Sequence, residues 1–294
     1  MQVKVWGTRG SLPTPGPDMV RYGGNTSCVQ VTLSDGTNLV LDAGTGIRNL
    51  PAELGSSTGP IHILLTHLHL DHIQGLLFFA PLFRPGAEVT IWGPAVAGLS
   101  LERRIARYLS APLAPVEIRE LPCRLDFRNC PRSQWSIGSA QLTAAAVTHR
   151  GPTLGFRIED TDGSLCYLPD HEPAIIGDID MLGPEWLSGS GLAREVDLLL
   201  HDCQYTDAEY AARVGWGHSS LTQALQFARR VSARRTLLFH HDPAHTDDQL
   251  DAMLDEARTL WTTGGGAKGE IGMTTESLDV TVARGHAAHA QRSG

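Results

Sequence analysis

The chain has 294 residues, enough for one large α/β domain or for two small ones. Its hydrophobic fraction of 41% is ordinary for a soluble globular protein, and no apolar run is long enough to span a bilayer. The formal net charge of −8 argues against long nucleic acid as an obligatory partner, because such polymers are bound mainly through neutralisation of their phosphates.

Short apolar segments rich in Val, Ile and Leu recur along the chain and predict strands. In chain order the predicted strands are Val3–Trp6, Cys28–Leu33, Asn38–Leu41, Ile61–Leu65, Glu88–Trp92, Gln141–Val147, Leu154–Glu159, Ser164–Leu168, Val196–Leu200 and Thr236–Phe239, with a further one near Ser277–Val282. Several are almost continuously apolar, which indicates sheets covered on both faces.

Two helices are predicted in the last third of the chain. Ser220 and Thr246 are each followed three residues later by glutamine, the spacing of a capping box, and apolar residues then recur at helical intervals. Less distinct helices are expected after His72 and near Gly98–Leu109.

These elements predict a single domain over residues 1–282, built from two sheets flanked by helices. Residues 79–135 are interpreted as an insertion that covers the functional site or forms an interface, such as a homodimer contact. Residues 283–294 are expected to form a flexible tail.

The segment LLTHLHLDHIQG (Leu64–Gly75) contains a dense group of potential metal ligands. His67, His69 and His72 offer imidazoles and Asp71 a carboxylate, a set that suits zinc and also manganese or iron. A role without metal is disfavoured, because clustered buried histidine and aspartate side chains are costly to desolvate. Four ligands on one turn suit a site for two metal ions better than a single tetrahedral ion.

Further potential ligands follow three other predicted strands: His149, Asp170 and His240. If these strands end at one edge of the sheets, the three side chains gather there. We predict that His67, His69 and His149 hold one metal ion, that Asp71, His72 and His240 hold the other, and that Asp170 bridges them. His241 is the alternative to His240, but the alternation of side chains along the strand favours His240.

The five cysteines are scattered, odd in number and never spaced as CxxC. This pattern argues against a disulfide framework and against a cysteine zinc site. The N-terminal residues MQVKVWGTRG predict a strand rather than a signal peptide. We therefore expect a cytoplasmic protein.

The motifs resemble those of the metallo-β-lactamase superfamily, in its binuclear phosphodiesterase branch that includes ribonuclease Z. The shared order is HxHxDH, a lone histidine, a bridging aspartate and a late histidine after an apolar strand. Further shared motifs are GTRGSLP (Gly7–Pro13), NTSC (Asn25–Cys28), LDAGTG (Leu41–Gly46), HDCQY (His201–Tyr205) and GHSS (Gly217–Ser220). The resemblance covers about residues 3–247. It implies an α/β fold, a four-layer αββα sandwich with the metals at one edge between the sheets.

The resemblance also implies that His218 donates a proton to the leaving oxygen; the alternative is a structural hydrogen bond near the helix start. His201 and Asp202 are candidates for supporting the ligands or for the same proton relay. Asp42 is expected to orient a ligand histidine. Arg9 is a candidate to meet a substrate phosphate, against the alternative of a solvated surface arginine.

The implied reaction is hydrolysis of a phosphodiester by a water that two metal ions share and activate. Asp71 is expected to accept the proton of this water, and His218 to protonate the leaving oxygen. Only twenty residues separate His149 from Asp170, whereas long ribonuclease Z forms carry a tRNA-gripping arm there. A small substrate such as a cyclic nucleotide is therefore expected.

Three alternatives remain open from the sequence. One is a ribonuclease Z-like RNA nuclease. Another is a lactone, thioester, sulfate-ester or β-lactam hydrolase on the same scaffold. The third is a metal-binding sensor or interaction protein without enzymatic activity.

Overall fold

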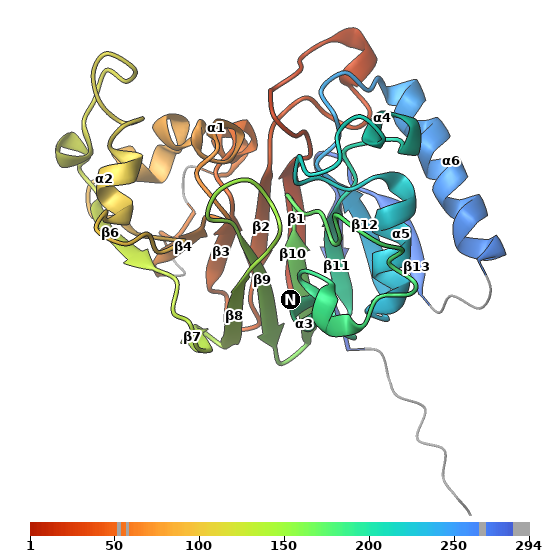
Figure 1. Ribbon diagram of the computed structural model, residues 1–294. Coiled ribbons are helices and arrows are strands. Elements are labelled where there is room, and N and C mark those ends of the chain that lie inside the picture. The colour runs from red at the N-terminus through yellow and green to blue at the C-terminus, as the bar shows by residue number, and fades with distance from the viewer. Residues whose placement is uncertain (52–53, 57–58, 265–268, 285–294) are drawn as a thin grey trace, which may run out of the picture.

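Two mixed β-sheets packed face to face form the centre of the molecule (Figure 1). The computed structural model describes residues 1–51, 54–56, 59–264 and 269–284. Within them, the strands of the first sheet are β1 (Gln2–Gly7), β2 (Cys28–Thr32), β3 (Asn38–Leu41), β4 (Ile61–Leu64), β5 (Glu88–Gly93), β6 (Arg124–Asn129) and β14 (Asp279–Thr281). Those of the second are β7 (Trp135–Ile137), β8 (Ala140–Ala146), β9 (Leu154–Asp160), β10 (Gly163–Leu168), β11 (Leu198–Asp202), β12 (Arg235–Phe239) and β13 (Glu270–Met273).

The strand orders are β14-β1-β2-β3-β4-β5-β6 and β13-β12-β11-β10-β9-β8-β7. In the first sheet β3, β4, β5 and β6 are parallel. In the second, β10, β11, β12 and β13 are parallel, and β9 is antiparallel to both of its neighbours, β8 and β10. Consequently β8 runs in the same direction as β10, and these strands end at the same edge of the sheet.

Helices cover the outer face of each sheet (Figure 1). Apolar residues of α1 (Leu70–Ile73) and α2 (Leu101–Ile105) pack on the first sheet, and those of α3 (Ser190–Ala193), α5 (Leu221–Arg230) and α6 (Asp247–Thr263) pack on the second. Helix α4 (Asp207–Tyr210) lies in the connection from β11 to α5. This arrangement confirms the predicted αββα sandwich. None of the helices in the described ranges has the length and hydrophobicity that a membrane crossing requires.

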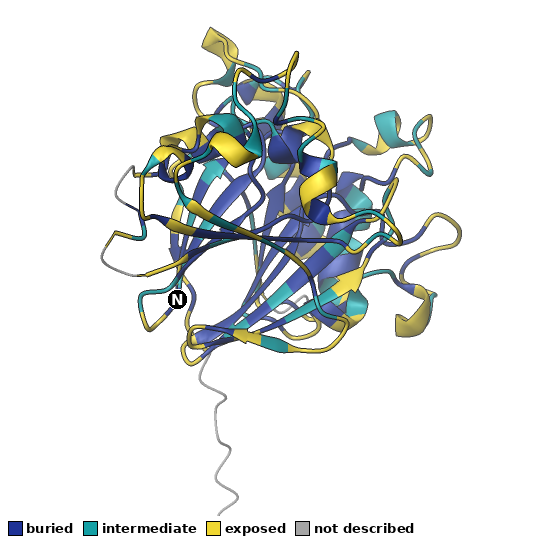
Figure 2. Cartoon of the chain, turned by 90° about the vertical axis from the view of Figure 1, so that its left-hand side faces the viewer, coloured by how far each residue is buried: buried dark blue, intermediate teal, exposed yellow. Residues whose placement is uncertain are grey.

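Side-chain alternation along the central strands produces the layers. In β3, Leu39 and Leu41 lie in the core between the sheets, whereas Val40 packs beneath the helices of the first sheet. In β10, Tyr167 points inward and Cys166 outward in the same way. Because both faces need apolar residues, these strands are mostly apolar, and they are buried throughout. Figure 2 shows buried strands at the centre of the molecule and exposed residues mainly in the outer loops and helices.

Helices α5 and α6 begin at the predicted capping boxes, where the Ser220 and Thr246 side chains accept hydrogen bonds from backbone N–H groups. The strand predicted at Val196–Leu200 lies two residues later, so His201 and Asp202 are within β11 rather than after it. Strands β6, β7 and β13 had no predicted counterpart, because they are short or, like β6 with the sequence RLDFRN, too polar to give an apolar signal.

Two segments singled out in the sequence lie wholly or partly within the described residues. Residues 79–135, predicted to be an insertion, contribute β5 and β6, which pair in the order β4-β5-β6 and complete one side of the first sheet. At the start of the predicted tail 283–294, the Arg284 backbone N–H donates to the Asp162 carbonyl. Residues 285–294 lie outside the described residues.

We predict that Phe156→Ala lowers the free energy of unfolding by about 3–5 kcal/mol, because this ring is completely buried between the sheets and its removal leaves a cavity. Urea denaturation measures the change. The matched control is Phe78→Ala, since Phe78 is 66% exposed and its removal should cost less than about 0.5 kcal/mol. Equal losses in the two variants would contradict the assigned core.

Candidate metal centre

The predicted ligands meet at one edge of the sandwich, where strands of both sheets end. Strand β4 leads into the turn and helix α1, which carry His67, His69, Asp71 and His72. In the second sheet, strands β8, β10 and β12 lead to His149, Asp170 and His240. Residues separated by up to 173 positions in the sequence therefore face one another.

A first group of ligand atoms belongs to His67, His69, His149 and Asp170, and all of these atoms lie within 4.8 Å of one another. His149 Nε2 is 3.2 Å from His69 Nδ1 and 3.4 Å from Asp170 Oδ2. His67 Nε2 is 3.5 Å from the same carboxylate oxygen. Ligands bound about 2.1 Å from one tetrahedral zinc ion are about 3.4 Å apart, so these separations suit one ion.

A second group consists of Asp71, His72 and His240. Asp71 Oδ2 lies 3.2 Å from His72 Nε2 and 3.3 Å from His240 Nε2. Asp170 Oδ1 lies 3.0 Å and 3.1 Å from the same two nitrogens. The Asp170 carboxylate thus turns one oxygen to each group, which is the geometry of a bridging ligand.

Three buried atoms at this centre form no well-oriented hydrogen bond among the described residues, although polar atoms lie within 3.5 Å of each: His67 Nε2, His72 Nε2 and Asp170 Oδ1. An unsatisfied buried polar atom costs about 1–3 kcal/mol, so its retention needs an explanation. Imidazole nitrogen and carboxylate oxygen are ligands for divalent zinc, manganese and iron. The donor set and its unsatisfied atoms therefore fit a pair of divalent metal ions.

The histidines of the first group are suited to bind metal because they are neutral near pH 7. Burial, reinforced by His72, lowers the pKa of His67 well below its ordinary value. Burial also lowers the pKa of His69, and it lowers the pKa of His149 to about 4. A neutral imidazole has the free lone pair that ligation requires.

The carboxylates of the centre remain ionised despite their burial. Burial alone would raise the pKa of Asp170, but His240, His72 and His67 hold it well below its usual range. Burial would likewise lower the pKa of His72, yet Asp170, Asp71 and Asp42 raise it well above its ordinary value. The carboxylates around His72 therefore favour a positive charge beside them, and a bound cation would supply it.

Four ligand histidines are oriented by a second protein contact. The ring nitrogen that faces away from the centre is held at 2.8–3.1 Å in the pairs His67 Nδ1–Thr66 Oγ1, His72 Nδ1–Asp42 Oδ2, His149 Nδ1–Gly217 O and His240 Nδ1–Gln204 Oε1. These contacts fix each ring and aim its Nε2 at the centre. The sequence analysis did not assign a role to Gln204, although it lies within the HDCQY motif.

Asp42 supports the centre from behind, where it is completely buried. It accepts hydrogen bonds from the Thr66 backbone N–H at 2.8 Å, His72 Nδ1 at 2.8 Å and the Tyr167 hydroxyl at 3.1 Å. Its backbone has φ 57°, a left-handed conformation that is uncommon for residues other than glycine. Asp42 therefore lies where it orients a ligand histidine.

His218 and Asp202 form a pair beside the centre. His218 Nδ1 donates to Asp202 Oδ2 at 2.7 Å, and the His218 ring stacks on that of His240 with centroids 5.1 Å apart. Burial alone would lower the pKa of His218, but Asp202 outweighs this effect and raises it to about 9. His218 is therefore protonated near neutral pH, with Nε2 free of Asp202.

Arg9 does not lie where the sequence interpretation placed it, and His241, the alternative to His240, lies away from the candidate ligands. Arg9 is completely buried, and it donates from Nε to the Gly23 carbonyl at 2.8 Å and from Nη1 to the His245 carbonyl at 2.6 Å. Its guanidinium group holds the N-terminal loop and cannot reach a substrate phosphate. His241 Nε2 donates to the Thr274 carbonyl at 2.9 Å, away from the ligands.

His201 also lies apart from the predicted proton relay. Its Nδ1 contacts the Asp202 carbonyl oxygen at 2.7 Å, its Nε2 contacts His171 Nδ1 at 2.9 Å, and its ring stacks on Phe227. His201 therefore lies on the face of β11 that packs against α5, where it contributes packing and hydrogen bonds. Of the pair His201 and Asp202, only the Asp202 side chain contacts His218.

Glu172 is a supporting residue that the sequence analysis missed. The carboxylate is completely buried and accepts from the Tyr210 hydroxyl at 2.6 Å and from the Gly215 and Gly217 N–H groups at 2.8 Å each. Gly217 has φ 92°, and a Cβ there would lie 2.5 Å from His149 Nδ1, so only glycine fits. Glu172 thus fixes the loop whose Gly217 carbonyl orients His149. The sequence offered one indication of this role: Glu172 lies only two residues after the proposed ligand Asp170.

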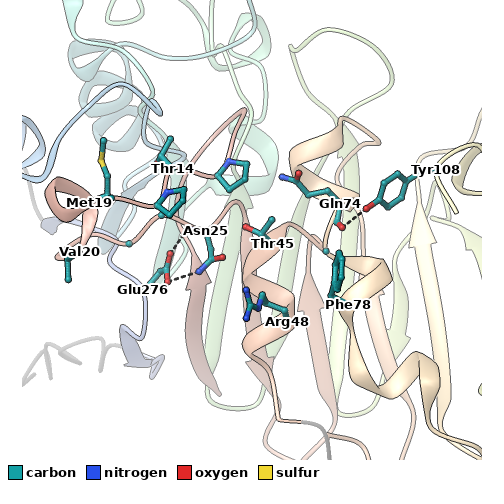
Figure 3. A pocket seen from close by; sticks show the side chains of 16 residues that line it. Thr14, Met19, Val20, Asn25, Thr45, Arg48, Gln74, Phe78, Tyr108 and Glu276 are labelled. Carbon is teal, nitrogen blue, oxygen red and sulfur yellow. Dashed lines mark hydrogen bonds between the residues drawn. The ribbon is translucent and has the colours of Figure 1, made fainter. Parts of the chain in front are cut away.

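Two cavities border this region. One, of about 350 Å³, is lined by His218 together with Ser11, Gln204, Arg150, Arg213 and Trp216, among others. The larger, of about 980 Å³, lies between the N-terminal loop and the segment that carries Gln74 and Phe78 (Figure 3). None of the proposed ligands lines the larger cavity.

We predict that Asp42→Asn weakens metal binding by about 10–100-fold, because an amide cannot accept all the hydrogen bonds that the carboxylate accepts and His72 loses its fixed orientation. Competition with a chromophoric chelator measures the affinity. Asp279→Asn, at an exposed strand position, is the control and should bind metal normally. Unchanged affinity in a folded Asp42→Asn protein would contradict the role given to Asp42.

Known proteins resemble this chain in sequence and in fold. Residues 37–241, more than half of the chain, match the family model described as "Beta-lactamase superfamily domain". A ribonuclease Z of Kineococcus radiotolerans is 26% identical over 297 residues, covering 87% of this chain and 88% of that protein. The human short-form tRNase Z structure has a TM-score of 0.65 at 21% identity, covering 97% and 100% of the two chains. A diphosphatase from the PhnP family has a TM-score of 0.64 at 19% identity, covering 95% and 97%. The chain therefore belongs to the β-lactamase superfamily.

Proposed function

We propose that the protein is a phosphodiester hydrolase that depends on two divalent metal ions. The proposed ligands are His67, His69, Asp71, His72, His149, Asp170 and His240. The observation that carries the proposal is the Asp170 carboxylate, which turns Oδ2 to one group of ligands and Oδ1 to the other. We expect zinc, with manganese and iron as alternatives, because the ligands are imidazoles and carboxylates.

The chemistry follows from the groups around the proposed centre. Two divalent ions held there by the proposed ligands would supply an activated water near neutral pH and would offset the negative charge of the phosphoryl oxygens. Asp71, whose Oδ2 also accepts the Ser11 N–H at 2.7 Å, is placed to accept a proton from that water. His218, protonated and held by Asp202 through Nδ1, is placed to deliver a proton from Nε2 to the leaving oxygen.

Among phosphodiesters, we propose a small substrate such as a cyclic nucleotide. The interval between His149 and Asp170 folds into the β9–β10 hairpin, without another helix or strand, which leaves no arm for gripping a large RNA. The net charge of −8 also disfavours a polyanion. A ribonuclease Z-like RNA nuclease is the second candidate, and the relatives that bear that name favour it.

A substrate panel distinguishes these candidates. Metal-loaded protein is assayed with bis-p-nitrophenyl phosphate, cyclic nucleotides, a short RNA with a 3′ extension, a thioester, a lactone and a β-lactam. The proposal predicts hydrolysis of the first two classes. Cleavage of the RNA without cyclic nucleotide turnover favours the second candidate. Hydrolysis of the lactam, lactone or thioester alone would contradict both.

We predict that Asp170→Asn lowers the metal content of the protein and abolishes phosphodiester turnover. The amide cannot bridge two cations with charged oxygens, so metal affinity should fall by more than the roughly 10–100-fold that loss of an outer contact costs. Elemental analysis of dialysed protein measures the metal. Full occupancy in this variant would show that Asp170 is not a ligand.

We predict that His218→Ala keeps normal metal content but lowers kcat by about 10²–10⁴-fold, because the leaving oxygen loses its proton donor. The effect should be smaller with p-nitrophenyl esters, whose leaving group needs little protonation. A variant with normal metal content and normal kcat on an alkyl phosphodiester would rule out this role.

A further inference from the structure

We propose that the cavity beside His218 binds the planar base of a nucleoside on the leaving-group side of the phosphodiester, through Trp216 and Arg150. This inference rests on the proposed function and names its substrate class.

The cavity adjoins the metal centre through three of its lining residues. His218 stacks on the proposed ligand His240. Gln204 accepts from His240 Nδ1, and the Ser11 backbone N–H donates to Asp71. Because His218 is the proposed proton donor to the leaving oxygen, a group attached to that oxygen extends into this cavity.

Trp216 is exposed but held in place. Its side chain is 51% exposed, so burial does not fix its position. Instead the glycines on either side, Gly215 and Gly217, both donate their N–H groups to the buried carboxylate of Glu172 at 2.8 Å. A large indole surface presented on an anchored backbone costs little further ordering when a flat ligand stacks on it.

Two arginines give the cavity positive charge in an otherwise acidic protein. The Arg150 guanidinium lies 5.9 Å from the Trp216 ring centroid, and that of Arg213 lies 5.0 Å from the Tyr205 centroid. Neither forms a salt bridge within the described ranges; Arg213 donates to the Glu209 carbonyl. The carboxylate that lines the cavity, Asp242, accepts from the Ala244 N–H at 2.8 Å.

A nucleoside base matches this combination in chemistry and size. Bases stack on aromatic rings and on arginine planes, and each stacked base contributes substantially to affinity. The volume of about 350 Å³ is at the lower end of ligand sites, which suits one nucleoside rather than an RNA helix. A purely aliphatic leaving group would leave both the indole and the guanidinium groups unused.

The test compares ligands with and without a base. Isothermal titration calorimetry of the metal-loaded protein measures binding of adenosine monophosphate and of ribose 5-phosphate. We expect the nucleotide to bind about 5- to 100-fold more tightly. Trp216→Ala should remove this preference without changing affinity for ribose 5-phosphate, and Arg150→Ala should reduce it. The control Trp186→Ala, at a tryptophan that is 72% exposed elsewhere, should keep it.

Equal affinity of the wild type for the two ligands, or a full preference in Trp216→Ala, would overturn the inference. Turnover separates this failure from that of the proposed function. Adenosine 3′,5′-cyclic phosphate is compared with the cyclic phosphate of ribose that lacks a base. Hydrolysis of both at equal kcat/KM means that the enzyme is a phosphodiesterase without a base subsite. Preferential nucleotide binding without turnover of either means that the subsite exists and the proposed reaction is wrong.

Discussion

The arrangement of this protein depends on one buried carboxylate. Asp170 is almost completely buried. Its Oδ2 lies 3.4–3.5 Å from the nitrogens of His67 and His149, and its Oδ1 lies 3.0–3.1 Å from those of His72 and His240. A buried charge is tolerated only when opposite charge compensates it. Neutral imidazoles such as His67 and His149 do not supply that charge, whereas divalent cations do. This requirement supports the proposal that cations bind here, where the seven candidate ligands from both sheets converge.

The sandwich provides the rigidity that such a centre requires. The candidate ligands follow strands β4, β8, β10 and β12. Strand β10 is buried throughout and β4 and β12 at all but one position, so the core fixes the backbone that leads to the centre. Further contacts, such as those of Asp42 and Gly217 with ligand histidines, then set the ring orientations. Glu172 fixes the loop that carries His218 and Trp216, because its carboxylate accepts hydrogen bonds from two backbone N–H groups of that loop. The proposed metal binding, proton transfer and substrate contact therefore depend on one connected set of hydrogen bonds.

The fold, and the convergence of the proposed ligand side chains, were predictable because their signals are local or are carried by motifs. Apolar runs marked the central strands, and the HLHLDH turn marked the centre. Arg9 was misjudged because a sequence does not show that three backbone carbonyls enclose its guanidinium group. His201 was ambiguous because the end of β11 was placed two residues too early, which hid its position in the strand. Glu172 and Gln204 act only through partners far along the chain, so spacing alone did not reveal them.

The central claim is that Asp170 bridges two metal ions. Anomalous scattering at the zinc absorption edge from crystals of the zinc-loaded protein tests it most directly. The account predicts two peaks on either side of the Asp170 carboxylate, one beside His67, His69 and His149 and the other beside Asp71, His72 and His240. A single peak, or two peaks of which neither contacts Asp170, would contradict it.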